Sequence, residues 1–439
     1  MKRILFILSL AALVLPSSAQ TRLWSLEDCI RYALDNNITL KQNALNVEQR
    51  EIELNTYLNS RLPAVSAAAG ENLSFGRGLT ADNTYANSNT SNTSFSVGAD
   101  VPVFNGNRIN NSIAMGRLNL KAATEDLEKA RDDIRVAVAQ AFVQILYNGE
   151  ILEVARRQVE IDSLQAVRLE KMALNGKASK AQVSAQKASL AKSRVSEVQA
   201  SNNYRISILD LTQLLELTDP ENFNVLKPSG DADPSVLLPG PDAIYQEAIG
   251  IKPVVLAEQT RLDYAARNID YAKGAYLPSL SFSAGLGSNY YTNSRSPSAA
   301  FFQQLGTNFS QYLGLSLNIP IFSRFSTRNN VRSAQVNFNN QKLQLDNVKK
   351  QLYKEIQQAY YNALASESKF ESSILAEESA KEAFSLMQGK YENGKATITE
   401  FNESKEQYLE AASNLVQARY EFLYLTRLLD FYRGKELVL

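Results

Sequence analysis

Hydrophobic and polar positions along the chain follow a helical period in some segments and an extended period in others. Residues 25–60 and 242–275 carry apolar side chains at helical spacing. Apolar and small polar residues then alternate in two stretches of each half, within 63–104 and 278–322. Alternation is typical of strands with one apolar and one polar face. The pattern therefore predicts two strands in each half, each of roughly ten residues, the length that a tilted strand needs to cross a bilayer.

A long helical stretch without proline follows each pair of strands, over about 107–172 and 325–390. At ~1.5 Å per residue, each such helix would be about 100 Å long, which is too long for the interior of a compact domain. Apolar residues recur along both stretches at the spacing of coiled-coil contacts. We therefore expect long antiparallel helices that pack against one another.

Short motifs recur between the two halves of the chain. Val101-Pro102-Val103-Phe104 returns as Ile319-Pro320-Ile321-Phe322, and Asn175-Gly176-Lys177 returns as Asn393-Gly394-Lys395. The predicted organisation is a signal peptide at 1–19, a first repeat at 20–217, a proline-rich linker at 218–241 and a second repeat at 242–439. Each repeat is expected to hold helices, a β-hairpin (about 63–104 or 278–322) and long helices.

The first residues have the features of an export signal. Lys2 and Arg3 precede an apolar run, and small residues lead to a cleavage site after Ala19. A retained anchor helix is the alternative. No later stretch approaches 18 consecutive apolar residues, so entry into a membrane would require a β-barrel. Four strands cannot close a barrel alone, whereas two copies would supply eight strands and three would supply twelve. A soluble four-stranded sheet capped by coiled coil is the other possibility.

Composition excludes several classes of function. The chain has 439 residues, with 46 basic and 46 acidic side chains, one cysteine and no histidine. A histidine zinc site, a Ser-His-Asp triad, a disulfide framework and an iron–sulfur cluster within one chain are therefore excluded. Balanced charge leaves no basic footprint for nucleic acid. We expect no catalytic, cofactor or metal site, and we expect Cys29 to be a buried small residue on the first helix.

The chain resembles the TolC family of outer-membrane efflux proteins over essentially its whole mature length. The resemblance lies in Ser25-Leu26-Glu27-Asp28-Cys29-Ile30, in the Leu-Pro pairs that open strands, in the Val-Pro-Val-Phe and Ile-Pro-Ile-Phe strand ends and in the Tyr391-x-Asn-Gly-Lys turn. It implies a mostly α fold with a small β part: long antiparallel coiled-coil helices form a periplasmic α-barrel, and four strands per chain enter a trimeric twelve-stranded outer-membrane β-barrel.

That resemblance also implies a function and partners. The protein would be the exit duct of a tripartite efflux or type I secretion system, located in the outer membrane with a long periplasmic extension. Its partners would be two further copies of itself, a periplasmic adaptor, an inner-membrane transporter and outer-membrane lipid. A structural or adhesive coiled-coil protein of the cell surface is the alternative from another class.

Candidate site residues cluster where the second long helix ends. Glu400 and Glu403 stand three apart and share a helix face. The resemblance implies that they ring the periplasmic entrance, where crowded carboxylates select cations and raise some pKa values; a solvated helix face is the alternative. The resemblance gives Tyr391 the role of an entrance latch. The latch's arginine and acidic positions fall on Ala396 and Gln182, which puts that latch in doubt.

The repeated Asn-Gly-Lys turns are expected at the periplasmic tips. Glycine supplies the positive φ that ends a helix, so capping is one role of these turns. The resemblance adds docking of the adaptor. The residues concerned are Asn175, Gly176, Lys177, Asn393, Gly394 and Lys395.

Overall fold

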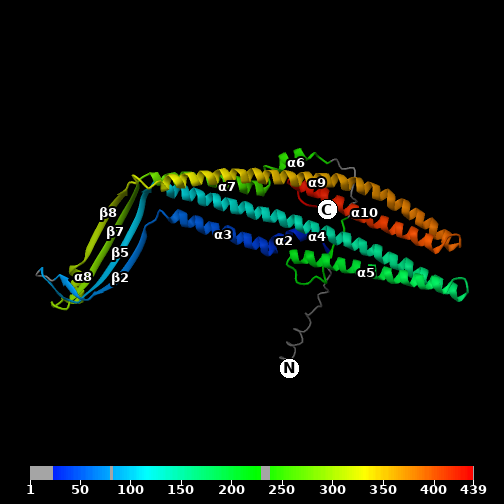
Figure 1. Ribbon diagram of the computed structural model, residues 1–439, viewed down its shortest axis with the longest axis horizontal. Coiled ribbons are helices and arrows are strands. Elements are labelled where there is room, and N and C mark those ends of the chain that lie inside the picture. Colours follow the sequence, from blue (N-terminus) through cyan, green and yellow to red (C-terminus); the bar gives the residue numbers. More distant parts are fainter. Residues whose placement is uncertain (1–22, 80–82, 229–237, 439) are drawn as a thin grey trace, which may run out of the picture. The chain divides into compact units, whose positions relative to one another are not determined.

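The computed structural model describes residues 23–79, 83–228 and 238–438, which are mostly helical with a small β part, as predicted (Figure 1). The predicted signal peptide at 1–19 lies outside the described residues, as does part of the predicted linker, residues 229–237. Cys29 is fully buried on a helix near the start of the described chain, which confirms its expected place.

The elements follow one another along the chain in this order: β1 (Leu23–Trp24), α2 (Leu26–Asn36), α3 (Ile38–Asn59), β2 (Ala64–Ser74), β3 (Arg77–Leu79), β4 (Tyr85–Asn87), β5 (Thr90–Asn105), α4 (Arg108–Leu174), α5 (Lys180–Leu214), β6 (Asn224–Val225), α6 (Pro241–Ala248), α7 (Pro253–Lys273), η1 (Gly274–Tyr276), β7 (Ser279–Asn293), α8 (Phe301–Thr307), β8 (Ser310–Asn318), α9 (Ser326–Glu392) and α10 (Ile398–Tyr432). The two predicted long helices are confirmed as α4 and α9, each of 67 residues.

The chain forms two compact units. The described residues of the first fall in Met1–Asn43, Leu127–Pro253 and Lys349–Leu439, and those of the second in Ala44–Asp126 and Val254–Val348. Each predicted repeat contributes residues to both units.

The second unit contains an antiparallel sheet with strand order β2-β5-β7-β8. β5 and β7, with 16 and 15 residues, are longer than the roughly ten residues expected. The outer ends of these two strands, near Thr90 and Asn293, are mostly polar, so the apolar alternation gives no signal there. The segments that join the strands of each hairpin also contain regular structure, namely the β3–β4 ladder and the helix α8.

The core of the first unit is built where α2, α4 and α5 meet. Ser25 caps α2 by accepting a hydrogen bond from the backbone N–H of Asp28. The fully or almost fully buried residues of this cluster are Cys29, Ala33, Val138, Ala139, Phe142, Ile145, Leu211 and Leu215. Their apolar surface stabilises the packing of these helices in proportion to the area removed from water.

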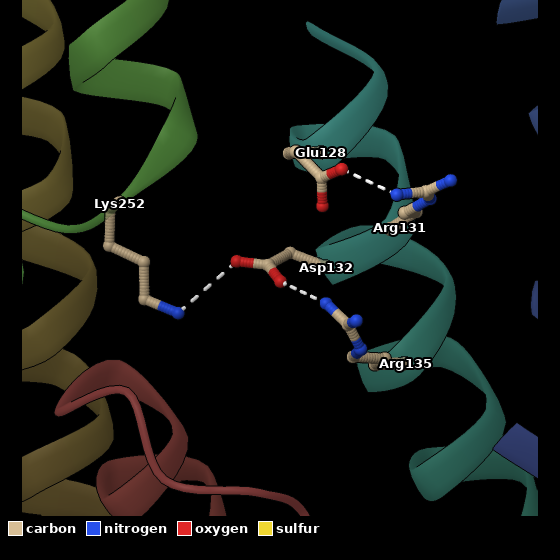
Figure 2. Close-up of polar contacts among 5 residues, drawn as sticks. All are labelled: Glu128, Arg131, Asp132, Arg135 and Lys252. Atoms are coloured by element: carbon tan, nitrogen blue, oxygen red, sulfur yellow. Dashed lines mark hydrogen bonds and ion pairs between the residues drawn. The ribbon is translucent and has the colours of Figure 1, made fainter. Parts of the chain in front are cut away.

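A buried lysine lies at one edge of the first unit (Figure 2). The Nζ of Lys252 is 3.3 Å from one carboxylate oxygen of Asp132, and Arg135 is 2.8 Å from the other. The ring of Phe431 lies 3.7 Å from the Lys252 ammonium, measured to the ring centroid. Burial lowers the pKa of Lys252, and the charge of Asp132 partly opposes that shift.

Two tyrosines of the first unit should make the protein sensitive to alkali. Burial raises the pKa of Tyr420 and that of Tyr432 from 10.0 to about 12, with smaller contributions from Glu150 and Glu355 respectively. Between these values the folded protein binds more protons than the unfolded chain, so the free energy of unfolding falls as pH rises from 10 to 12. Lys252 acts in the opposite direction, since its lowered pKa makes its contribution increase with pH up to its unfolded value.

The expected result is a melting temperature that drops between pH 10 and pH 12, and that drops less in the Tyr420→Phe, Tyr432→Phe double variant. Thermal melting followed by circular dichroism at several pH values measures this difference. Equal drops in both proteins would show that these phenols do not cause the alkaline loss.

Candidate functional site

The two helical hairpins of the first unit end in equivalent turns, at residues 175–179 and 393–397. Gly176 and Gly394 have φ values of 68° and 70°, in the left-handed region that favours glycine. In each turn the lysine after the glycine donates its backbone N–H, over 2.8 Å, to a carbonyl five residues earlier. The side chains of Asn175 and Asn393 donate to carbonyls four residues earlier. These contacts account for the capping role of both turns.

Each returning helix begins with a capping box. Ser179 and Gln182 bond reciprocally at the start of α5, and Thr397 and Glu400 do so at the start of α10. The Glu400 carboxylate accepts from the Thr397 backbone N–H at 2.7 Å and from the Thr397 hydroxyl at 2.8 Å. Gln182 and Glu400 therefore occupy the same capping position, and only the second of them is charged.

The hydrogen bonds from Thr397 lower the pKa of Glu400. This direction is opposite to the one expected for carboxylates crowded at an entrance, because donors that bond the charged form favour it. Glu403 lies three residues further along the helix and is exposed. Within the described ranges, Glu403 has no hydrogen bond or ion pair with another side chain. No local contact of this side chain therefore explains why a glutamate stands at position 403.

Tyr391 lies at the end of α9 between an aromatic ring and a cation. Its ring stacks on Phe401 with centroids 4.9 Å apart, and the Arg168 guanidinium lies 5.5 Å from its centroid. Arg168 also donates to the backbone carbonyl of Glu392 at 2.8 Å. Burial raises the pKa of Tyr391, and Arg168 opposes the shift. The cation beside Tyr391 thus comes from α4, whereas the family pattern pointed to position 396.

A buried ion pair joins α4 to α10 behind the tips. Asp162 and Lys405 are hydrogen bonded, and their side chains are 0% and 1% exposed. Gln186 of α5 donates to the same Asp162 oxygen at 3.3 Å. Sequence reasoning missed this pair. The sequence signalled only the burial of Asp162, because this residue falls seven residues from both Ala155 and Leu169, which are buried apolar residues.

The layer around this pair has acceptors in excess. Among the described residues, Asp162 Oδ2, Gln165 Oε1 and Gln186 Oε1 are buried without a hydrogen-bond partner. An unpaired buried acceptor costs about 1–3 kcal/mol. The helices at this level are therefore held less tightly than an apolar layer of the same size would hold them.

The described part of the chain offers neither a metal-binding cluster nor a membrane-spanning helix. In residues 23–79, 83–228 and 238–438, no group of three or more histidine, cysteine, aspartate or glutamate residues could hold a metal ion. Across the same ranges, no helix is both long and apolar enough to cross a membrane.

A four-stranded antiparallel sheet, two 67-residue helices and capped helical hairpins define the class of fold, a mostly helical protein with a small β part. The chain belongs to the outer membrane efflux protein family, whose model matches residues 29–216 and 244–427. The family expected from the sequence is thereby confirmed.

The sequence identity of the chain to individual relatives is low. The chain is 27% identical to the outer membrane protein TolC of Escherichia coli (strain K12) over 237 residues, which are 52% of this chain and 46% of TolC. The matched region thus spans about half the length of this relative. A membrane protein from Pseudomonas aeruginosa shares the fold with a TM-score of 0.78 at 18% identity, covering 93% of each chain. VceC of Vibrio cholerae does so with a TM-score of 0.77 at 16% identity, covering 94% of this chain and 96% of VceC.

Proposed function

We propose that the protein is the outer-membrane exit duct of a tripartite efflux or type I secretion system, through which cargo passes passively. The observation that carries this proposal is the two-faced sheet of the second unit. One face exposes large apolar side chains to the surroundings: Val65, Phe95, Val97, Leu286, Leu313, Leu315 and Leu317. A sheet that exposes one apolar face and one polar face suits lipid on the first side and water on the second. A surface fibre has no need of such a face.

Three copies of the chain would complete the duct. Within the described residues, β2 pairs only with β5 and β8 pairs only with β7, so both edges of the sheet are open. Open edges are not tolerated in lipid, because their backbone groups lack partners. Three sheets joined edge to edge would form a closed sheet of twelve strands, and the helical hairpins of three chains would continue the duct across the periplasm.

Within this proposal, Glu400 and Glu403 form an acidic ring at the periplasmic entrance. The position of these two residues supports the proposed ring, because both lie in the first turns of α10, directly after the tip of the second hairpin. The capping box explains why a hydrogen-bonding side chain stands at 400, but a glutamine does the same at 182. Capping therefore does not require the charge at 400, and it does not involve Glu403.

Tyr391 and the tips complete the proposed entrance. Tyr391 would help to hold the entrance closed, with Arg168 and Phe401 fixing its ring. Both tip lysines are exposed and free to meet a periplasmic adaptor, which in turn would connect the duct to an inner-membrane transporter. The proposed docking residues are Asn175, Gly176, Lys177, Asn393, Gly394 and Lys395.

Single-channel recording in a planar bilayer tests the duct and its entrance together. We expect small cation-selective currents that divalent cations block, and we expect the Glu400→Gln, Glu403→Gln double variant to lose both properties, because the ring would lose six carboxylates per trimer. The Glu378→Gln, Glu382→Gln double variant removes as many exposed charges from α9 and should behave as wild type. A protein that never conducts would refute the duct, and unchanged selectivity in the first variant would refute the acidic ring alone.

A further inference from the structure

Three successive rows on the polar face of the four-stranded sheet carry small residues, one aspartate and one tyrosine. These rows cross β2, β5, β7 and β8 on this face, from the helix side outward: Ala64, Asp100, Ser283, Gly314; then Ser66, Gly98, Gly285, Tyr312; then Ala68, Ser96, Gly287, Ser310. Tyr312 is the one aromatic residue of these three rows. It shares its row with two glycines on the adjacent strands.

The Tyr312 side chain lies across those glycines. A methyl group on Gly285 would lie 2.5 Å from Cε1 of Tyr312 and 2.8 Å from its Cζ, so the ring occupies the space of a side chain at 285. The Tyr312 hydroxyl reaches the next strand, 4.0 Å from where a methyl group on Gly98 would stand. The ring therefore rests flat along the sheet over Gly285, with its hydroxyl toward Gly98.

Among the described residues, the helix that packs on the sheet lies on its opposite face. The helix α8, which follows β7, packs through Phe301 against Phe95 and Tyr290, with ring centroids 6.3 and 5.1 Å apart. Phe95 and Tyr290 belong to the opposite, apolar face. The side chain of Tyr312 remains 59% exposed. The sheet on which the ring rests thus determines its position.

We infer that the Tyr312 ring sets the width of the duct at this level. Gly285 keeps this ring flat against the sheet. This inference rests on the proposed function, in which the polar face lines the duct. By symmetry, three copies would bring three tyrosines to one level of the lumen, and the other residues in the row of each tyrosine are glycine or serine. A side chain at 285 would push each ring off the sheet, because Cβ atoms do not approach other heavy atoms within 3.0 Å. The raised rings would narrow the passage for bulky cargo more than for small cargo.

The test uses a reporter cysteine on each side of this level, on the polar face. Ser281→Cys lies on the helix side of Tyr312 and Ser94→Cys lies on the loop side. Small and bulky methanethiosulfonate reagents are added outside intact cells that carry the full chain. Cys29 is fully buried, so the reagents should not label it. Labelling of the protein without a reporter cysteine checks this.

We expect Gly285→Ala to lower the bulky-to-small ratio of labelling rates at Ser281→Cys about tenfold, equivalent to about 1.4 kcal/mol in the barrier to passage. Gly98→Ala is the matched control in the same row and should leave the ratio unchanged, since its methyl group meets the hydroxyl at ordinary contact distance. Adding Tyr312→Ser to Gly285→Ala should restore the ratio. Ser94→Cys should react equally in all variants, which shows that each is folded and inserted.

Two results would overturn the inference: an unchanged ratio in Gly285→Ala, or an equal loss with and without Tyr312. A separate result would overturn the proposed function itself. If the small reagent labels Ser94→Cys in the wild-type background and never reaches Ser281→Cys, the polar face is not a continuous passage.

Discussion

Replacing Lys405 with methionine should destabilise the packing of α10 against α4 by about 3–5 kcal/mol, because the change leaves the carboxylate of Asp162 buried without its cation. Both side chains are almost completely buried, and the only other donor to the Asp162 side chain within the described chain is the amide of Gln186. A buried charge that loses its partner cannot recover its hydration unless the helices separate. The loss should therefore appear as local opening of α4, α5 and α10 near the tips.

Hydrogen exchange of the full-length protein, read by mass spectrometry on peptides from these helices, measures the opening. Lys187→Met is the matched control: Lys187 and Glu170 are 2.7 Å apart, but their side chains are 60% and 45% exposed, so the loss should be about 0–1 kcal/mol. The double variant Asp162→Leu, Lys405→Met should recover most of the lost protection, because it removes both charges. Equal protection in Lys405→Met and Lys187→Met would contradict the assigned role of the buried pair.

Phe401→Ala should have an effect of similar size, about 3–5 kcal/mol, through a cavity directly behind the tip of the second hairpin. Phe401 is fully buried and contacts two aromatic rings, those of Phe384 at 5.6 Å and Tyr391 at 4.9 Å between centroids. Tyr391 would lose the ring on which it stacks. If Tyr391 helps to close the entrance, the variant should also conduct more than wild type.

Hydrogen exchange and single-channel recording separate these two consequences. Phe401→Leu keeps most of the volume and should cost less than about 1.5 kcal/mol. Leu386→Ala truncates a residue of α9 that is 63% exposed, and should change stability by less than about 0.5 kcal/mol. A Phe401→Ala protein with lost protection and unchanged conductance would support the packing role and reject the closing role of Tyr391.

Both sites tie helices from the two predicted repeats to each other within the first unit. Asp162 and Arg168 lie on α4, and their partners Lys405 and Glu392 come from the second repeat. The candidate residues taken from the family pattern, Glu400 and Tyr391, sit beside these ties. Asp162, Arg168, Glu392 and Lys405 were therefore not among the residues that the family pattern named.

The difference follows from the range of the contacts. The Asn-Gly-Lys turns and the residues that cap α5 and α10 are readable from the sequence, because each turn or cap is made by residues at most five apart. The ion pair of Asp162 with Lys405 and the placement of Arg168 beside Tyr391 depend on which helices become neighbours. No local spacing specifies that choice.

By itself, the sequence determined the type of each major element, since periods of 3.6 and 2 require only a chain with one apolar face. It also determined the faces of the strands, with Leu313, Leu315 and Leu317 opposite Tyr312 and Gly314. Only the tertiary structure decided the strand order β2-β5-β7-β8, which brings Gly98, Gly285 and Tyr312 into one row. Pairing of β5 with β7 joins segments far apart in the chain, and its register is set by the packing of whole faces.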